Sequence, residues 1–153
     1  MNNTEMIQQL PLININDSLF MNIGNDLSDD NIKSLLGKNI IFKLTDDIED
    51  FGLLGILEDY KDNQIIIRRE GVSLVFELNE LFGIEEYHLN NTIEIPKKLI
   101  NCICEITNYK NSNIIGLVTD INDYDVVFKI KTNKEKIITI NYPKELVKNI
   151  KIM

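Results

Sequence analysis

The sequence lacks tryptophan and alanine altogether, and its 153 residues include only one histidine and two arginines. With His88 as the single histidine and no glycine-rich phosphate loop, no nucleophile–base arrangement is visible, so we predict neither an enzyme nor a bound cofactor. Bidentate binding of phosphate groups generally uses arginine, and Arg68 and Arg69 are the only two in the chain. The abundant Ile, Asn and Lys are explained by an AT-rich coding genome, and the asparagines are not interpreted as a metal-binding or prion-like signal.

Cysteine is scarce as well. Cys102 and Cys104 are the only two, and they stand two apart in a strand-like run, so we expect both on one face. A disulfide between such neighbours would be strained, and a structural zinc site wants about four ligands. We therefore predict packed free thiols, no metal, and a reducing compartment.

Targeting and membrane signals are also missing. The first ten residues, MNNTEMIQQL, have neither the basic region nor the apolar core of a signal peptide. No apolar run approaches the roughly 20 residues that a membrane-spanning helix requires. The expected location is the cytoplasm, with no membrane partner.

Charge of one sign dominates the first two thirds of the chain. The net charge is −8, made up of −4 in residues 1–36, −7 in residues 37–90 and +3 in residues 91–153. An acidic surface disfavours nucleic acid, because release of phosphate counterions needs clustered Lys and Arg. It suits a basic protein partner, and any phosphate contact is expected in the last third.

What the sequence does contain is a repeat. Residues 53–68 read LLGILEDYKDNQIIIR, and residues 114–129 read IIGLVTDINDYDVVFK, 61 positions later. Almost every apolar residue of the first segment aligns with an apolar residue of the second. Other matches are Gly55 with Gly116, Asp59 with Asp120, and Asp62 with Asp123. This pattern predicts that one small fold was copied.

Each copy reads as five short strands separated by turn signals. In the first copy, alternation of Ile40, Phe42 and Leu44 predicts a half-buried strand; in the second, we match it to the alternating series Ile100, Cys102, Cys104 and Ile106. Glycines inside the next strand favour bends, and turns are predicted at 59–63 and 120–125.

The residues before the first copy are expected to contribute little regular structure. Residues 1–11 are predicted to be irregular, and residues 12–20 to include a short strand at an edge. Ser28 is a candidate N-cap, with two acids in the first turn and Gly37 as a stop, which predicts a helix over 29–36.

A repeat of about 55 residues with five strands suits a small closed barrel. The chain resembles the SH3-like barrel folds, which include the Sm-like and KOW-type modules, and the helix before the first strand is similar to the Sm-like arrangement. The fold class expected is mainly β, with two tandem five-stranded barrels at 37–90 and 95–153 after an arm with a short helix at 1–36. Within the Sm-like resemblance, Asp46 stands for the acid of the first loop, whereas the glycine usually beside it is Asp47 here.

Three groups of residues are candidates for function. The densest acidic cluster would be a docking face for a basic protein, or only a solvated loop; it contains Asp46, Asp47, Glu49, Asp50, Glu58 and Asp59. The basic hairpin would contact nucleic acid, with a tyrosine as a stacking ring, or only protect an edge; it contains Lys129, Lys131, Lys134, Lys136, Tyr124 and Tyr142. The repeated aspartates would be metal ligands or acid–base groups, or caps of turns.

Ile66 and Val127 alternate away from their buried neighbours and are expected to point outward, toward the other barrel or a partner. Together these features favour a non-catalytic protein-binding module, such as an adaptor, an assembly component or an inhibitor, that uses the acidic face of the first barrel. The alternative is an RNA-associated Sm-like module using the basic hairpin, and homo-oligomers fit either. A more distant alternative is an enzyme with acids at the barrel seam.

Overall fold

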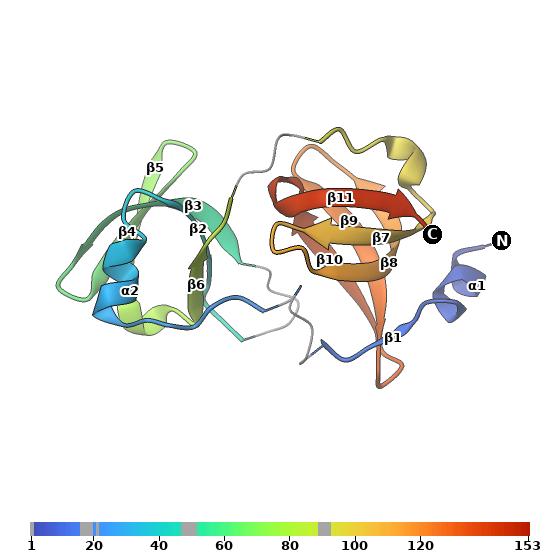
Figure 1. The fold of residues 1–153 in the computed structure, drawn as a ribbon, viewed down its shortest axis with the longest axis horizontal. Helices are drawn as coiled ribbons and strands as arrows, with labels where there is room; N and C mark the ends of the chain where they lie inside the picture. The colour runs from blue at the N-terminus through green and yellow to red at the C-terminus, as the bar shows by residue number, and fades with distance from the viewer. Residues whose placement is uncertain (1, 16–19, 21, 47–51, 89–92) are drawn as a thin grey trace. The chain divides into compact units, whose positions relative to one another are not determined.

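The computed structural model describes residues 2–15, 20, 22–46, 52–88 and 93–153. The protein is mainly β, with two sheets, one of which curls into a half-barrel (Figure 1). It divides into two compact units. We call Ile23–His88 the continuous unit, and Met1–Asn22 together with Leu89–Met153 the split unit.

The continuous unit contains a five-stranded antiparallel sheet in the order β5-β4-β3-β2-β6. Its elements are α2 (Asp29–Ser34), β2 (Asn39–Lys43), β3 (Leu53–Lys61), β4 (Gln64–Arg69), β5 (Val72–Glu77), the 3₁₀ turn η2 (Leu78–Glu80) and β6 (Gly83–Glu86).

Local chemistry fixes where α2 begins and what it covers. The Ser28 side chain accepts a hydrogen bond from the Asn31 N–H, and two acids lie in the first turn, where the helix dipole favours them. Ile32 of α2 and Leu35, the residue that caps its C-terminus, pack into a core with Ile40, Phe42, Leu57, Ile65, Ile67, Leu81 and Ile84. The helix therefore fills the inside of the curved sheet.

The split unit contains the second sheet, in the order β1-β9-β8-β7-β11, with β10 also paired to β9. Its elements are α1 (Asn3–Gln8), β1 (Leu12–Ile13), η3 (Lys97–Leu99), β7 (Ile103–Asn108), β8 (Asn113–Ile121), β9 (Asp125–Thr132), β10 (Ile137–Pro143), η4 (Lys144–Leu146) and β11 (Val147–Ile152).

The amino-terminal residues belong to this second sheet. Leu12 and Ile13 pair in parallel with Lys131 and Thr132 of β9, and α1 is a helix capped by the Asn2 side chain. The expectation of irregular structure over residues 1–11 is thus wrong, because the Asn2 cap makes a short helix favourable. Residues 16–19 of the predicted edge segment lie outside the described residues.

The central hairpins of the two units have the same register at the spacing of the sequence repeat. Ile56 faces Arg68 in one hairpin, and Leu117 faces Lys129 in the other, so pairs shifted by 61 residues hold the same register. Each long strand also has a register shift at the same place, between Leu57 and Asp59 and between Val118 and Asp120. One extra residue at these bulges bends the strand.

Glycine allows the bend. A Cβ on Gly55 would lie 2.5 Å from Ile67 Cγ2, and one on Gly116 would lie 2.8 Å from Phe128 Cδ2. The residues that crowd the two glycines are again 61 apart. The first half of β3 therefore pairs with β2 and its second half with β4. In the same way, β8 pairs first with β7 and then with β9.

Two details predicted for the first strand of each copy are wrong. Gly55 faces Ile40 and Gly116 faces Cys104, so Ile40 matches Cys104, 64 residues later, and not Ile100 as predicted. The reason is a connection between β7 and β8 that is three residues shorter, because the later strands keep the shift of 61. Ile41 is buried like Ile40, so β2 is covered on both faces and alternation fails there.

The predicted turns also begin too early. β3 continues through Asp59 to Lys61, and only Asp62 and Asn63 form the turn, both with positive φ, as a two-residue hairpin favours. In the second copy, β8 continues to Ile121.

The sheets are open at their outer strands. Within the described ranges no ladder joins β5 to β6 or β10 to β11. The edge of β6 is nevertheless covered, because the Ile84 N–H donates to the Gly24 carbonyl at 2.8 Å.

Gly55→Ala tests the close contact at the bend. The added methyl meets Ile67 and the Arg68 carbonyl, so we expect a loss of about 1–3 kcal/mol in the free energy of unfolding, measured by urea titration. Gly24→Ala is the control: its nearest neighbour is 3.4 Å away, and we expect a change within about 0.5 kcal/mol. Equal stability of the two variants would contradict the role given to Gly55.

Candidate functional site

The acidic residues predicted from the sequence fall in two places. Asp46 is exposed just after β2, and Asp47, Glu49 and Asp50 lie outside the described residues. Glu58 and Asp59 lie in β3, both exposed. The structure therefore gives a geometry for the second part of the acidic cluster only.

The bulge in β3 brings Glu58 and Asp59 to the same face. Leu57 faces the buried Ile67, and Asp59 faces Ile66 on the opposite side of the sheet, with Glu58 as the inserted residue. Without the insertion, alternation would send one of two adjacent side chains into the core. The two carboxylates instead lie side by side on the outer face.

Contacts hold Glu58 over this face. Its carboxylate lies 3.6 Å from Arg68 Nε and accepts a hydrogen bond from Ser73 Oγ at 3.3 Å. Asp59 accepts a hydrogen bond from the Tyr60 N–H at 2.8 Å. The neighbouring strands β4 and β5 thus help to position Glu58, whereas Asp59 bonds within β3.

An apolar pair, the partly exposed Ile66 and the exposed Val75, adjoins the two acids. Ile66 faces Val75 across the β4–β5 ladder, and Val75 is 59% exposed. We call Glu58, Asp59, Ile66, Arg68, Ser73 and Val75 the outer patch. Val75 was not identified from the sequence, although its spacing from the inward Leu74 and Phe76 would have placed it outside.

The corresponding face of the split unit has different side chains. Thr119, Asp120, Val127 and Asn141 occupy the ladder positions of Glu58, Asp59, Ile66 and Val75. Ile66 and Val127 are both partly exposed, in keeping with their predicted outward direction. The split unit therefore has one carboxylate fewer at these positions and no exposed valine.

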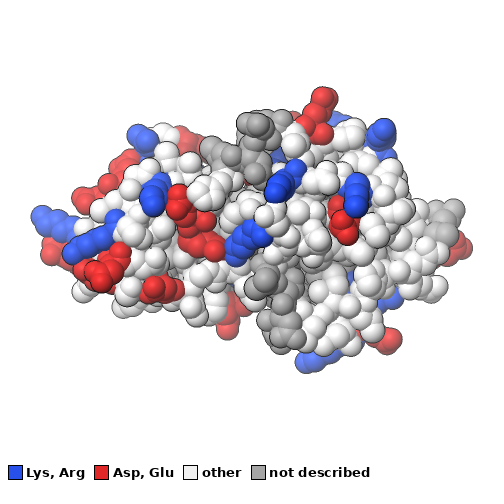
Figure 2. All heavy atoms as spheres, in the orientation of Figure 1, with Lys and Arg blue, Asp and Glu red and all other residues white. Residues whose placement is uncertain are grey.

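Charge separates the two units in the same way. The continuous unit has fifteen acids and six basic residues, whereas the split unit has nine acids and ten lysines. Figure 2 shows several Asp and Glu side chains on the visible face of the continuous unit, with Lys and Arg among them.

The repeated aspartates lie in strand bulges and turns. Asp59 and Asp120 lie in the bulges and Asp62 in a turn, and in the second copy it is Asn122 that caps the turn, accepting from the Tyr124 and Asp125 N–H groups. Across the described ranges, no three His, Cys, Asp or Glu side chains are grouped to hold a metal ion.

The basic hairpin is only partly available to a ligand. Lys134 and Lys136 are exposed near the turn, but Lys131 Nζ donates to the Gln8 carbonyl at 3.1 Å, and Lys129 is half-buried. Tyr142 is 2% exposed, packs 4.6 Å from the Phe20 ring, and bonds Asn108 through its hydroxyl. Its ring cannot stack on a base, which removes Tyr142 from the predicted nucleic-acid contacts; Tyr124 is 76% exposed.

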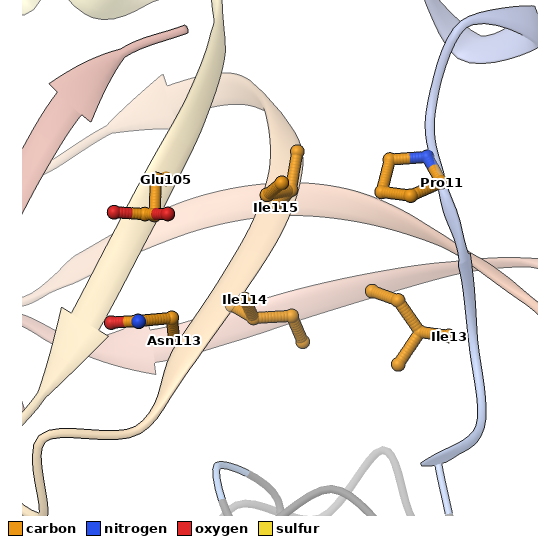
Figure 3. Close-up of a pocket in the computed structure, with 6 residues that line it drawn as sticks. All are labelled: Pro11, Ile13, Glu105, Asn113, Ile114 and Ile115. Atoms are coloured by element: carbon orange, nitrogen blue, oxygen red, sulfur yellow. The ribbon is translucent and has the colours of Figure 1, made fainter.

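The split unit also has a shallow pocket beside β1 (Figure 3). It measures about 210 Å³ and is lined by Pro11, Ile13, Glu105, Asn113, Ile114 and Ile115. It forms because β8 pairs with β9 only from Leu117 onward, while β1 takes the β9 edge at Lys131. The lining is mostly apolar, and its one acid, Glu105, is paired with Lys151 at 3.4 Å.

Neither family models, curated proteins nor solved structures give a match to this chain. Among the described residues, no helix has the length and apolar character needed to cross a bilayer.

The two cysteines are free, as predicted, and differ in burial. Cys104 is fully buried in β7, and burial, with a smaller contribution from Cys102, raises the pKa of its thiol to about 11. The reactive thiolate is therefore rare near neutral pH. We expect iodoacetamide at pH 8 to modify the half-buried Cys102 before Cys104, as measured by peptide mass spectrometry.

The urea-unfolded chain is the control for this experiment, since both thiols should then react at similar rates. Modification of Cys104 as fast as Cys102 in the folded protein would contradict its burial.

Proposed function

We propose that the chain is a non-catalytic protein-binding module of the cytoplasm, which uses an acidic face of the continuous unit to hold a basic protein. The observation that carries this proposal is the outer patch, where a bulge sets Glu58 and Asp59 side by side next to Ile66 and Val75. The carboxylates would attract a basic surface, and the adjoining apolar pair would be buried when that surface binds. An adaptor, an assembly component and an inhibitor would all use such a face.

We infer that both units are SH3-like barrels that arose by duplication. The matched register, bulges and glycines of the two units support it, as does the shared strand order of β5-β4-β3-β2-β6 and β10-β9-β8-β7-β11. Duplication explains why the inner positions agree and leaves the outer positions free to take separate roles.

The two units supply a matched pair of variants. Glu58→Lys with Asp59→Lys reverses the charges of the outer patch, and Thr119→Lys with Asp120→Lys makes the equivalent change in the split unit. All four positions are at least partly exposed, so both variants should fold. The full chain, immobilised, is used to capture proteins from a lysate of the organism that encodes it, with nuclease added.

We expect the native chain and the split-unit variant to retain the same nuclease-resistant protein, and the outer-patch variant to retain at least about tenfold less of it. Equal recovery by both variants would contradict the assignment of the face. Loss of all bound material on nuclease treatment would replace the proposal by nucleic-acid binding through the exposed lysines of the basic hairpin.

A further inference from the structure

The outer patch ends at a strand edge that nothing in the described chain covers. β5 is the last strand of its sheet, and among the described residues only β4 pairs with it. At the other end of the sheet the edge of β6 is covered, because the Ile84 N–H donates a hydrogen bond to the Gly24 carbonyl.

The hairpin geometry identifies the free backbone groups. Glu70 and Gly71 form a two-residue turn with positive φ at both positions, so the flanking pair Arg69–Val72 is the hydrogen-bonded kind. Because hydrogen-bonded pairs alternate with the other kind, Leu74 and Phe76 bond to β4. The N–H and C=O groups of Ser73 and Val75 therefore point to the open edge.

This edge lacks the features that normally keep sheet edges from pairing. β5 has six residues in unbroken register, contains neither Lys nor Pro, and exposes Val72 and Val75 at 58% and 59%. The equivalent edge strand of the split unit, β10, ends in Pro143 and lies between Lys136 and Lys144. Lysine and proline are common protections of edges, so only one of the two copies has them.

Charge determines which kind of strand would fit. Residues 70–80 include Glu70, Glu77 and Glu80 and no basic residue, so carboxylates lie at both ends of β5. At the Glu70 end, Arg69 of β4 faces Val72 on the side away from the open edge. Beside Glu77 is a hollow of about 420 Å³, lined also by Leu27, Asn63, Leu78 and Asn79. A second copy paired antiparallel would set Glu70 near the other Glu77, and like charges facing each other are unfavourable.

We propose that the open edge of β5 receives an extended segment of the partner protein by β-strand addition, with apolar residues in its middle and Lys or Arg near both ends. This inference rests on the proposed function and names the partner's chemistry. The main-chain bonds would be made by Ser73 and Val75, and the basic ends, roughly 20 Å apart, would meet Glu70 and Glu77.

The probe is a synthetic peptide of about eight residues with lysines at both ends and alternating valine and threonine between them. Amide hydrogen exchange of the full chain is followed residue by residue by NMR. We expect protection of the Ser73 and Val75 amides to rise at least about tenfold at saturating peptide. Unchanged exchange of these amides while the peptide is bound would overturn the proposal.

A second peptide keeps the lysines but has proline in place of each valine, so that it has the same charge and cannot complete a ladder. We expect it to bind at least about tenfold more weakly, and equal binding would overturn strand addition in favour of charge alone. Protection of Ser73 and Val75 that grows with protein concentration, without any peptide, would overturn it in favour of a second copy.

Val75→Lys places a protecting charge on the edge, and Asn141→Lys is the matched change on β10. We expect the first to weaken peptide binding at least about tenfold and the second to leave it unchanged; equal affinity would count against the edge. If lysate capture still depends on Glu58 and Asp59 while the β5 amides stay unprotected, strand addition fails and the proposed function stands.

Discussion

Both units depend on one close backbone contact, where a long strand crosses its neighbour at a glycine. At Gly55 and at Gly116 there is no room for a Cβ, and the strand can bend there because it carries none. The bulge two residues later adds to the bend. In the continuous unit β3 pairs with both β2 and β4, and in the split unit β8 pairs with both β7 and β9. The curvature that encloses each core follows from this arrangement.

The same bulge that bends the sheet also creates the outer patch. An inserted residue has no place in the alternation of a strand, so Glu58 and Asp59 both point away from the core. In the second copy the inserted position holds Thr119, and the patch has no exposed valine. Inner positions are constrained by packing, whereas side chains at outer positions can differ without disturbing the core. The two copies therefore share a backbone and differ in the surface that it presents.

Edge protection shows the same division of roles. Pro143 and the lysines that flank β10 are features of a strand whose outer edge stays unpaired, and β5 has neither of them. An unprotected edge with exposed valines is a liability for a free protein unless something binds it. Carboxylates at both ends of this edge are the basis on which we propose a basic partner strand rather than a second copy of the chain.

Side-chain period and spacing in the sequence predicted two hairpins with matching patterns and the outward direction of Ile66 and Val127, because both follow directly from strand geometry. The paired strands and the packing were needed to show that Asp59 lies in a strand, that Tyr142 is buried, and that Val75 stands beside Ile66. Periodicity gives the face of a strand on which a residue lies. It cannot give the register between strands, the inserted residue of a bulge or the strand left at an edge, since these depend on hydrogen bonds between distant segments.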